Sequence, residues 1–193
     1  MNEPYDDDFN TYREPIIIGN DFSQLFACGK NENYELTFRG YKVIDTPSGT
    51  TVPKNKAVHY VSSGATHAAM ITTDGSLYML GSSLHGKLGL LKCDAMNVAT
   101  PKLLVIERDN PVVQVVCGDY HTLTLMGNGE VYGWGGNLHK KLVGNAGVPT
   151  KIEILAAYKI VKIACGDFHS MALSCMLKSN WNALRLGRWR HTF

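Results

Sequence analysis

Histidine recurs at one fixed distance after glycine in three places along the chain. These Gly-x-x-His elements are Gly64–His67, Gly118–His121 and Gly166–His169. An imidazole can ligate a metal ion or move a proton, so three of them raise the hypothesis of a zinc site. Zinc requires three or four ligands within about 2.0–2.1 Å of one point, whereas equivalent positions in successive repeats stand much farther apart. We therefore predict no metal, and we interpret these histidines as structural groups hydrogen-bonded to neighbouring backbone.

A carboxylate precedes two of the histidines and suggests nucleophilic catalysis. Asp119 lies two residues before His121, and Asp167 two before His169, so each pair shares a face of an extended segment. Ser170 follows directly, but adjacent strand residues point to opposite faces, so its hydroxyl cannot readily meet the imidazole of His169. A carboxylate–imidazole bond that fixes a turn is the favoured interpretation. We predict no catalytic residue and no enzyme activity.

Glycines also gather near residue 130, which suggests a phosphate-binding loop. The group consists of Gly127, Gly129, Gly133, Gly135 and Gly136. A phosphate loop needs a strand, a loop and then a helix, whereas a strand-like run follows here at once. Hairpin turns account for the glycines, and we predict no cofactor.

The composition is that of a globular protein with charged ends. Hydrophobic residues make up 45% of the 193 residues and charged residues 19%, which suits one domain with a sizeable core. Residues 1–15 carry five carboxylates against one arginine, and residues 176–193 carry four basic residues and no carboxylate.

The cysteines and the N-terminal residues bear on the cellular compartment of the protein. Five cysteines form no C-x-x-C pair and are odd in number, which favours free thiols in a reducing environment. The acidic N-terminus and its longest apolar run, three isoleucines, predict neither a secretory signal nor a membrane span. We expect a cytoplasmic or nuclear protein without membrane contact.

Two independent elements repeat with nearly the same period. The Gly-x-x-His elements are 54 and 48 residues apart (118 − 64 and 166 − 118). Strand-like segments that end in glycine recur at 25–29, 77–81 and 131–135, followed by the matching runs KNENYEL, SSLHGKL and GNLHKKL. A period near fifty residues indicates a repeat in which each unit is one supersecondary element.

Each unit reads as a meander of four short strands. PVVQVVC (111–117) suits a strand covered on both faces, and HTLTLM (121–126), EVYGWG (130–135) and KIEIL (151–155) supply three more. The Asp-Gly and Asn-Gly pairs at 74–75 and 128–129 predict tight hairpin turns that use positive φ angles. Four strands in about fifty residues are typical of a propeller blade. Glycine before each histidine would permit close backbone approach near the axis.

The combined pattern resembles the regulator of chromosome condensation repeat family. The chain matches G-x-x-H-[ST]-x-x-L, then D-G or N-G, then V-Y-x-W-G-x-N and a leucine, best over 118–142, and departs from it where Tyr34 replaces the family's glycine. The resemblance implies an all-β fold, a seven-bladed β-propeller in the family. Here it predicts a partial, open propeller of about three four-stranded blades with irregular termini. The structural signature comprises Gly64, His67, Gly81, Gly118, His121, Trp134, Gly135, Gly166 and His169.

We predict an acidic segment at 1–15, repeats at 16–175 and a divergent basic tail at 176–193. The repeats divide at about 16–63, 64–117 and 118–165, with the start of a further one at 166–175. Three blades and a fragment cannot close a seven-bladed ring, so exposed blade edges would aggregate or pair. The chain would then be a truncated product without independent activity, or one whose edges another chain covers.

The expected function is that of a non-catalytic protein-interaction module. Candidate contacts are Asn137, Lys140 and Lys141, which follow the V-Y-x-W-G strand where the copies differ most in charge. The resemblance implies an alternative, part of a guanine-nucleotide exchange factor for a small GTPase, because the family's founding member acts so on Ran at chromatin. Arg188 and Arg190 in the basic tail are candidates for contact with an acidic surface, nucleic acid or chromatin.

Overall fold

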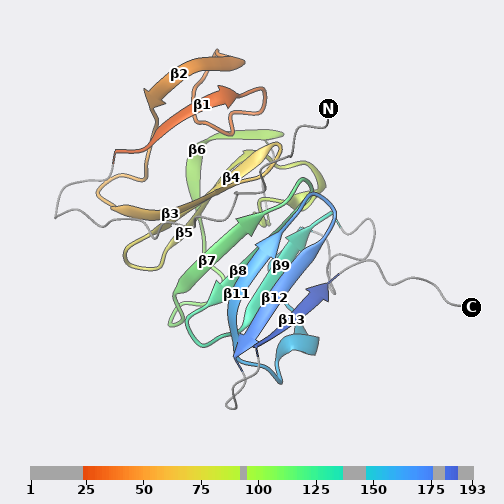
Figure 1. Cartoon of the computed structure of the whole chain (residues 1–193). Helices are drawn as coiled ribbons and strands as arrows, with labels where there is room; N and C mark the ends of the chain where they lie inside the picture. Colours follow the sequence, from red (N-terminus) through yellow and green to blue (C-terminus); the bar gives the residue numbers. More distant parts are fainter. Residues whose placement is uncertain (1–23, 92–94, 137–146, 176–180, 187–193) are drawn as a thin grey trace, which may run out of the picture.

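Thirteen short strands form four antiparallel sheets in the described part of the chain, in a computed structural model (Figure 1). The structure describes residues 24–91, 95–136, 147–175 and the backbone of 181–186. Each sheet is a meander, because strands adjacent in sequence are also adjacent in the sheet. The described residues include no α-helix, and no described helix is long and apolar enough to cross a membrane. The all-β, partial-propeller prediction is confirmed.

Two of the sheets have four strands. The first of them contains β3 (Val58–Ser63), β4 (His67–Thr72), β5 (Leu77–Ser82) and β6 (Asn97–Leu104). The second contains β7 (Val112–Cys117), β8 (His121–Met126), β9 (Val131–Gly135) and β10 (Thr150–Lys151). Each sheet therefore starts with the strand that precedes the Gly-x-x-His element. Structural blades begin about six residues before the sequence repeats.

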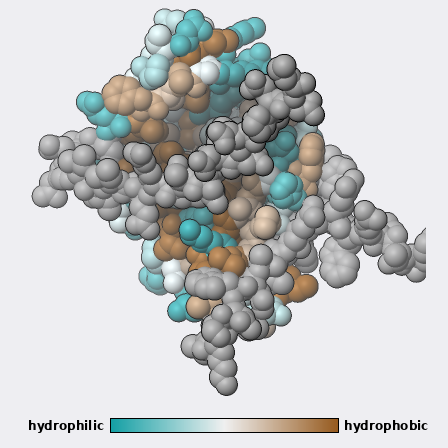
Figure 2. All heavy atoms as spheres, viewed as in Figure 1, coloured by the Kyte–Doolittle hydropathy of each residue, from teal (hydrophilic) through white to brown (hydrophobic). Residues whose placement is uncertain are grey.

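The sheets at the two ends of the array are smaller. One is β1 (Phe26–Lys30) paired with β2 (Val43–Gly49). The other contains β11 (Ile160–Cys165), β12 (Ser170–Cys175) and β13 (Trp181–Leu186). Apolar side chains reach the surface over the two-stranded sheet at the top of Figure 2, where Phe26 is 58% exposed and Val43 56%.

The tight hairpins predicted at the Asp-Gly and Asn-Gly pairs join the second and third strands of both four-stranded sheets, and glycine alone supplies the positive φ angle. Only Gly75 (φ +78°) and Gly129 (φ +88°) have positive φ, while Asp74 and Asn128 do not. The amide of Gly75 donates to the carbonyl of Thr72, so the loop is a three-residue turn with glycine at the left-handed position. The aspartate and asparagine contribute by accepting bonds from backbone amides two residues on.

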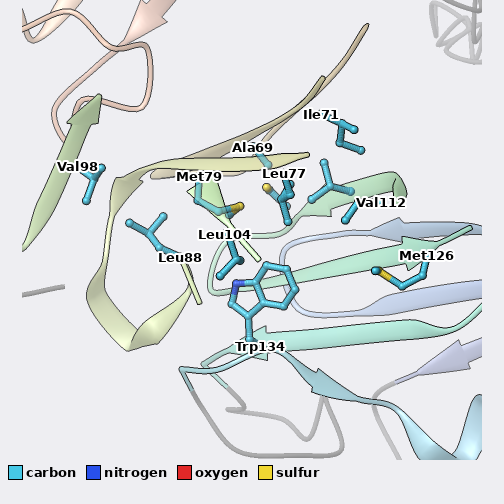
Figure 3. Close-up of a cluster of buried hydrophobic side chains, with 12 residues drawn as sticks. Ala69, Ile71, Leu77, Met79, Leu88, Val98, Leu104, Val112, Met126 and Trp134 are labelled. Atoms are coloured by element: carbon cyan, nitrogen blue, oxygen red, sulfur yellow. The ribbon is translucent and has the colours of Figure 1, made fainter. Parts of the chain in front are cut away.

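Neighbouring four-stranded sheets share one core. Strand β4 packs on β7, and β8 packs on β11, so the second strand of one sheet covers the first strand of the next. Figure 3 shows Met79, Leu88 and Trp134 facing one another in this core. All three are at most 1% exposed, and each buried side chain of this size contributes about 1.5–3 kcal/mol. No blade could bury these residues alone.

Two local predictions were wrong. Val113 is 46% exposed, so β7 is covered on one face along part of its length, next to a register shift between Val112 and Gln114. The expected strand at 151–155 is a two-residue strand followed by a 3₁₀ turn, Glu153–Leu155. The turn places Ile152 and Leu155 together in the core of the second sheet pair, which a straight strand could not do because its residues alternate between faces.

Candidate functional site

The glycines that start the first two histidine elements, Gly64 and Gly118, lie against the backbone of the next blade. A Cβ added to Gly64 would overlap the carbonyl oxygen of Gly118. A Cβ on Gly118 would in turn lie 2.8 Å from the carbonyl oxygen of Gly166 and 2.6 Å from Cε1 of His121. None of these glycines has a positive φ, so the requirement is steric. Three signature glycines thus form one row across three blades.

Two of the three signature histidines, His67 and His121, connect blades. The hydroxyl of Thr122 donates to the carbonyl of Lys87 (2.9 Å), so its oxygen accepts from Nε2–H of His67, 2.8 Å away. In the same way Nε2 of His121 lies 2.7 Å from Oγ of Ser170. We expected backbone partners, whereas Nε2 of each ring instead meets a hydroxyl on the following sheet.

The dipeptide His-[Ser/Thr] explains this geometry. Adjacent strand residues point to opposite faces, so His121 reaches forward to Ser170 while Thr122 reaches back to His67. His67 and His121 are fully buried, whereas His169 is exposed at the last described sheet. All three keep one backbone geometry, because the amides of Gly64, Gly118 and Gly166 each donate to the carbonyl of the histidine three residues on, at 2.9 Å.

Burial keeps the linking imidazole neutral. It lowers the pKa of His67 to about 3, and the positive charge of Lys87 acts in the same direction. No group of three His, Cys, Asp or Glu side chains in the described ranges could hold a metal ion.

Lys87 is the centre of a polar cluster that we did not predict. Its carbonyl accepts from Nε1–H of the fully buried Trp134 (2.9 Å) as well as from Thr122. The residue is 3% exposed, and its ammonium donates to Oγ1 of Thr66 and lies 5.8 Å from the ring centroid of Tyr120. Burial lowers the pKa of Lys87, and the carboxylates of Asp119 and Glu35 oppose that shift.

The same repeat position holds Glu35 in the first copy. The matching runs KNENYEL and SSLHGKL align Glu35 with Lys87, and GNLHKKL adds Lys141. A change of charge sign at one repeat position was therefore visible in the sequence, although its burial was not.

Beside Lys87, rings from successive blades form a row at the histidine ends of the sheets. The rings of His85 and Tyr120 meet edge to face at 5.6 Å, and those of Tyr120 and Phe168 stack at 6.1 Å. Tyr120 and Phe168 hold the same repeat position, directly before the signature histidine. Phe168 is 51% exposed. We call His85, Tyr120 and Phe168 the aromatic row.

The remaining signature glycines support this end of the blades. Gly81 (φ +98°), next to the last residue of β5, and Gly135 (φ +103°), the last residue of β9, lie in the left-handed region, and a Cβ on either would lie 2.6–2.8 Å from the Cα of the histidine on the paired strand. Five predicted contact residues lie outside the described residues: Asn137, Lys140, Lys141, Arg188 and Arg190.

Stacked meanders that interlock through buried histidines define a β-propeller built from repeated blades. Two copies of the family model for the regulator of chromosome condensation (RCC1) repeat match residues 74–125 and 128–173, and a second model of the same repeat matches residues 112–140. Because these matches span just over half of its residues, the chain belongs to the RCC1 repeat family.

Known proteins with sequence similarity are larger. The chain is 42% identical over 82 residues to the mouse serine/threonine-protein kinase Nek9, which is 42% of this chain and 8% of the kinase. It is 30% identical over 131 residues to the mouse RCC1-like G exchanging factor-like protein, 60% of this chain and 28% of that protein. The chain thus spans a small part of the relatives it matches.

Solved structures share the fold. Human WBSCR16 superposes with a TM-score of 0.69 at 23% identity, over 83% of this chain and 42% of that one. Prp20p from Saccharomyces cerevisiae gives a TM-score of 0.70 at 22% identity, over 81% of this chain and 40% of that one.

Proposed function

We propose that these blades form a non-catalytic protein-interaction module whose partner binds at the aromatic row. The observation that carries this proposal is the stacking of Tyr120 and Phe168 across two blades, with Phe168 51% exposed. Aromatic side chains are enriched where proteins bind one another, because they bury a large area at a low cost in entropy.

The burial of the reactive groups supports a scaffold role for them. The imidazoles of His67 and His121 are fully buried between blades, where no substrate could reach them. Cys117 is also buried, and burial raises the pKa of its thiol to about 12, so it would not supply a thiolate nucleophile. The thiols of Cys28 and Cys117 are free, which favours the cytoplasm or the nucleus.

Cross-linking and affinity capture with the full chain would test this function. We expect a partner that the wild type and Tyr41→Ala both retain, because Tyr41 is an exposed aromatic outside the row. Phe168→Ala should lower its recovery about tenfold or more, as for a residue at the centre of an interface. Equal recovery with all three proteins, or none above background, would contradict the proposal.

A second candidate is part of a guanine-nucleotide exchange factor for a small GTPase. It is favoured by the relative named as a G exchanging factor-like protein. It is also favoured by Prp20p, which shares the fold and has binding properties toward Gsp1p and histones. Nucleotide release from a panel of small GTPases, loaded with fluorescent GDP, should accelerate when the chain is added. Unchanged release rates across the panel would end this idea.

A further inference from the structure

The two-stranded sheet lacks a strand that both four-stranded sheets have. The third strand of each complete blade carries a repeat glycine, Gly81 in β5 and Gly135 in β9, and Gly29 of β1 holds the same repeat position. β1 and β2 are therefore the third and fourth strands of a blade. Within the described residues β1 pairs with β2 alone (Figure 1), whereas β5 and β9 have a partner on both sides. No described strand takes the second position of this blade.

The edge of β1 on that side is open. Four of the five residues of β1 are exposed, and Ala27 is half-buried. The edge of a strand carries N–H and C=O groups that can pair with a further strand, which is how an extended peptide adds to a sheet. β1 therefore offers a place for one more strand.

A groove runs along β3 beside the start of β1. Two hollows of about 160 Å³ and about 150 Å³ lie between residues 24–27 and β3, and both are lined by Leu25 and Val61. Together their walls include every residue of β3. Among the described wall residues, Glu35 is the one Asp, Glu, Lys or Arg, and it is 5% exposed. The accessible surface of the groove is therefore largely uncharged.

The exposure of Val61 shows that a second strand is missing above this groove. Val61, Val115 and Ile163 hold one repeat position, three residues before each signature glycine. Val115 is 0% exposed and Ile163 is 4% exposed, because the second strand of the preceding blade covers them: β4 packs on β7, and β8 packs on β11. Val61 is 49% exposed. The groove is thus the same interface between blades, with its covering strand absent from the described residues.

The strands that cover the equivalent positions define what the groove accepts. Leu123 and Leu125 of β8 share one core with Ile163. Ala69 and Ile71 of β4 hold the same two positions in the preceding blade. Residues two apart on a strand point to the same face. The groove therefore fits an extended segment with apolar side chains at alternate positions.

The sequence that precedes β1 does not carry the features of a second strand. Pro15 stands at the repeat position of the signature histidine, when counted back from Gly29. Ser23 stands at the position of Gly75. Gly75 and Gly129 supply the positive φ angle of the hairpin, which serine rarely adopts, and proline has no N–H to give to a ladder. The hairpin of the two complete blades is therefore not encoded before β1.

We propose that an extended segment of a partner protein adds to the open edge of β1 as the missing second strand and lays alternating apolar side chains along β3. Main-chain hydrogen bonds to β1 hold the segment, and the contact with Val61 selects its apolar face. The segment runs antiparallel to β1, as β4 runs to β5 and β8 to β9. This surface uses no residue of the aromatic row, so it is a second interaction site beyond the one proposed above.

Titration of the ¹⁵N-labelled full chain with a capped peptide of residues 119–126 would test the site, because this peptide contains β8. We expect saturable shifts at the backbone amides of β1 and β3. The same peptide with aspartate in place of Leu123 and Leu125 should bind at least about tenfold more weakly, since it loses its apolar face. A peptide N-methylated at alternate amides keeps the side chains but cannot complete the ladder, and it should not bind.

Two variants of the chain match the peptide controls. Val61→Asp places a charge in the groove at an exposed position, so the fold should persist while binding weakens at least about tenfold. Val113→Asp changes a valine of β7 that is also exposed, 46% against 49%, and it should bind the peptide as the wild type does. Equal affinity of Val61→Asp and the wild type would show that the peptide does not lie along β3 and would overturn the proposal.

Three other results would also overturn it. They are the absence of saturable shifts at β1, equal binding of the N-methylated peptide, and slow hydrogen exchange at the β1 amides that do not bond to β2 before any peptide is added. The last result would show that another part of this chain, or a second copy of it, already fills the groove. Recovery of a partner through Phe168 does not depend on this groove, so the two sites fail or hold separately.

Discussion

Acid should destabilise this fold through one buried imidazole, that of His67. The ring is fully buried and donates from Nε2 to Thr122 in the next blade. Its folded-state pKa is about 3, while an unfolded histidine has a pKa of about 6.5. A pKa that is depressed by folding adds stability above the unfolded value and removes it as the pH falls toward the folded value.

The size of the effect follows from these two values. Between about pH 7 and about pH 5, His67 takes up a proton in the unfolded chain and stays neutral in the folded chain. This difference lowers the free energy of unfolding by about 2 kcal/mol. In urea unfolding followed by circular dichroism, the wild type should lose about that much more stability on acidification than His67→Gln, whose amide keeps a donor for Thr122. His85→Gln, with its exposed ring, should behave as the wild type. Equal acid sensitivity of wild type and His67→Gln would refute the reasoning.

Three further substitutions test the contacts between blades. Gly64→Ala, whose new Cβ would overlap the Gly118 carbonyl, should lower the free energy of unfolding by about 1–3 kcal/mol and the melting temperature by about 2–4 °C per kcal/mol. As a control, Gly49→Ala should melt as the wild type, because a Cβ at Gly49 has nothing within 4 Å. If Gly64→Ala also melted as the wild type, the steric argument would be contradicted. Thr122→Val should lower the free energy of unfolding in urea by about 1–3 kcal/mol, because it removes the hydroxyl that bonds to the Nε2–H of His67 and to the carbonyl of Lys87. Trp134→Phe removes the pyrrole half of the buried indole and the 2.9 Å hydrogen bond to the carbonyl of Lys87. It should lower the free energy of unfolding by about 2–4 kcal/mol. Calorimetry that shows no loss of stability would contradict a role for Trp134 in holding the blades together.

Much of the fold could be predicted from the sequence because each blade is a local meander. The periods of the glycine and histidine elements, the β-branched runs and the Asp-Gly and Asn-Gly pairs all depend on neighbours in sequence. The structure follows them closely for β4, β5, β8 and β9. The prediction failed at residues 151–155, where packing of Ile152 and Leu155 on the next sheet favours a turn over a strand.

The candidate site was less predictable because its contacts join residues about fifty positions apart. The bond from His67 to Thr122 spans 55 residues, and that from His121 to Ser170 spans 49. Nothing in the local pattern around His67 specifies a hydroxyl on another sheet. The buried charges of Glu35 and Lys87 depend in the same way on which strands close over them, although their alignment at one repeat position was a usable signal.

The link from imidazole to hydroxyl gives the stack of blades a direction. The sheet β7–β10 offers the ring of His121 on one side and the hydroxyl of Thr122 on the other, so it joins its two neighbours head to tail and not face to face. Duplication or removal of a whole unit between equivalent positions preserves every such junction, since the groups that meet stay the same. An exchange of the two residues His121 and Thr122 would instead break the junctions with both neighbouring sheets at once. Evolution and design can therefore lengthen or shorten this array by whole repeat units more readily than by changes at single residues.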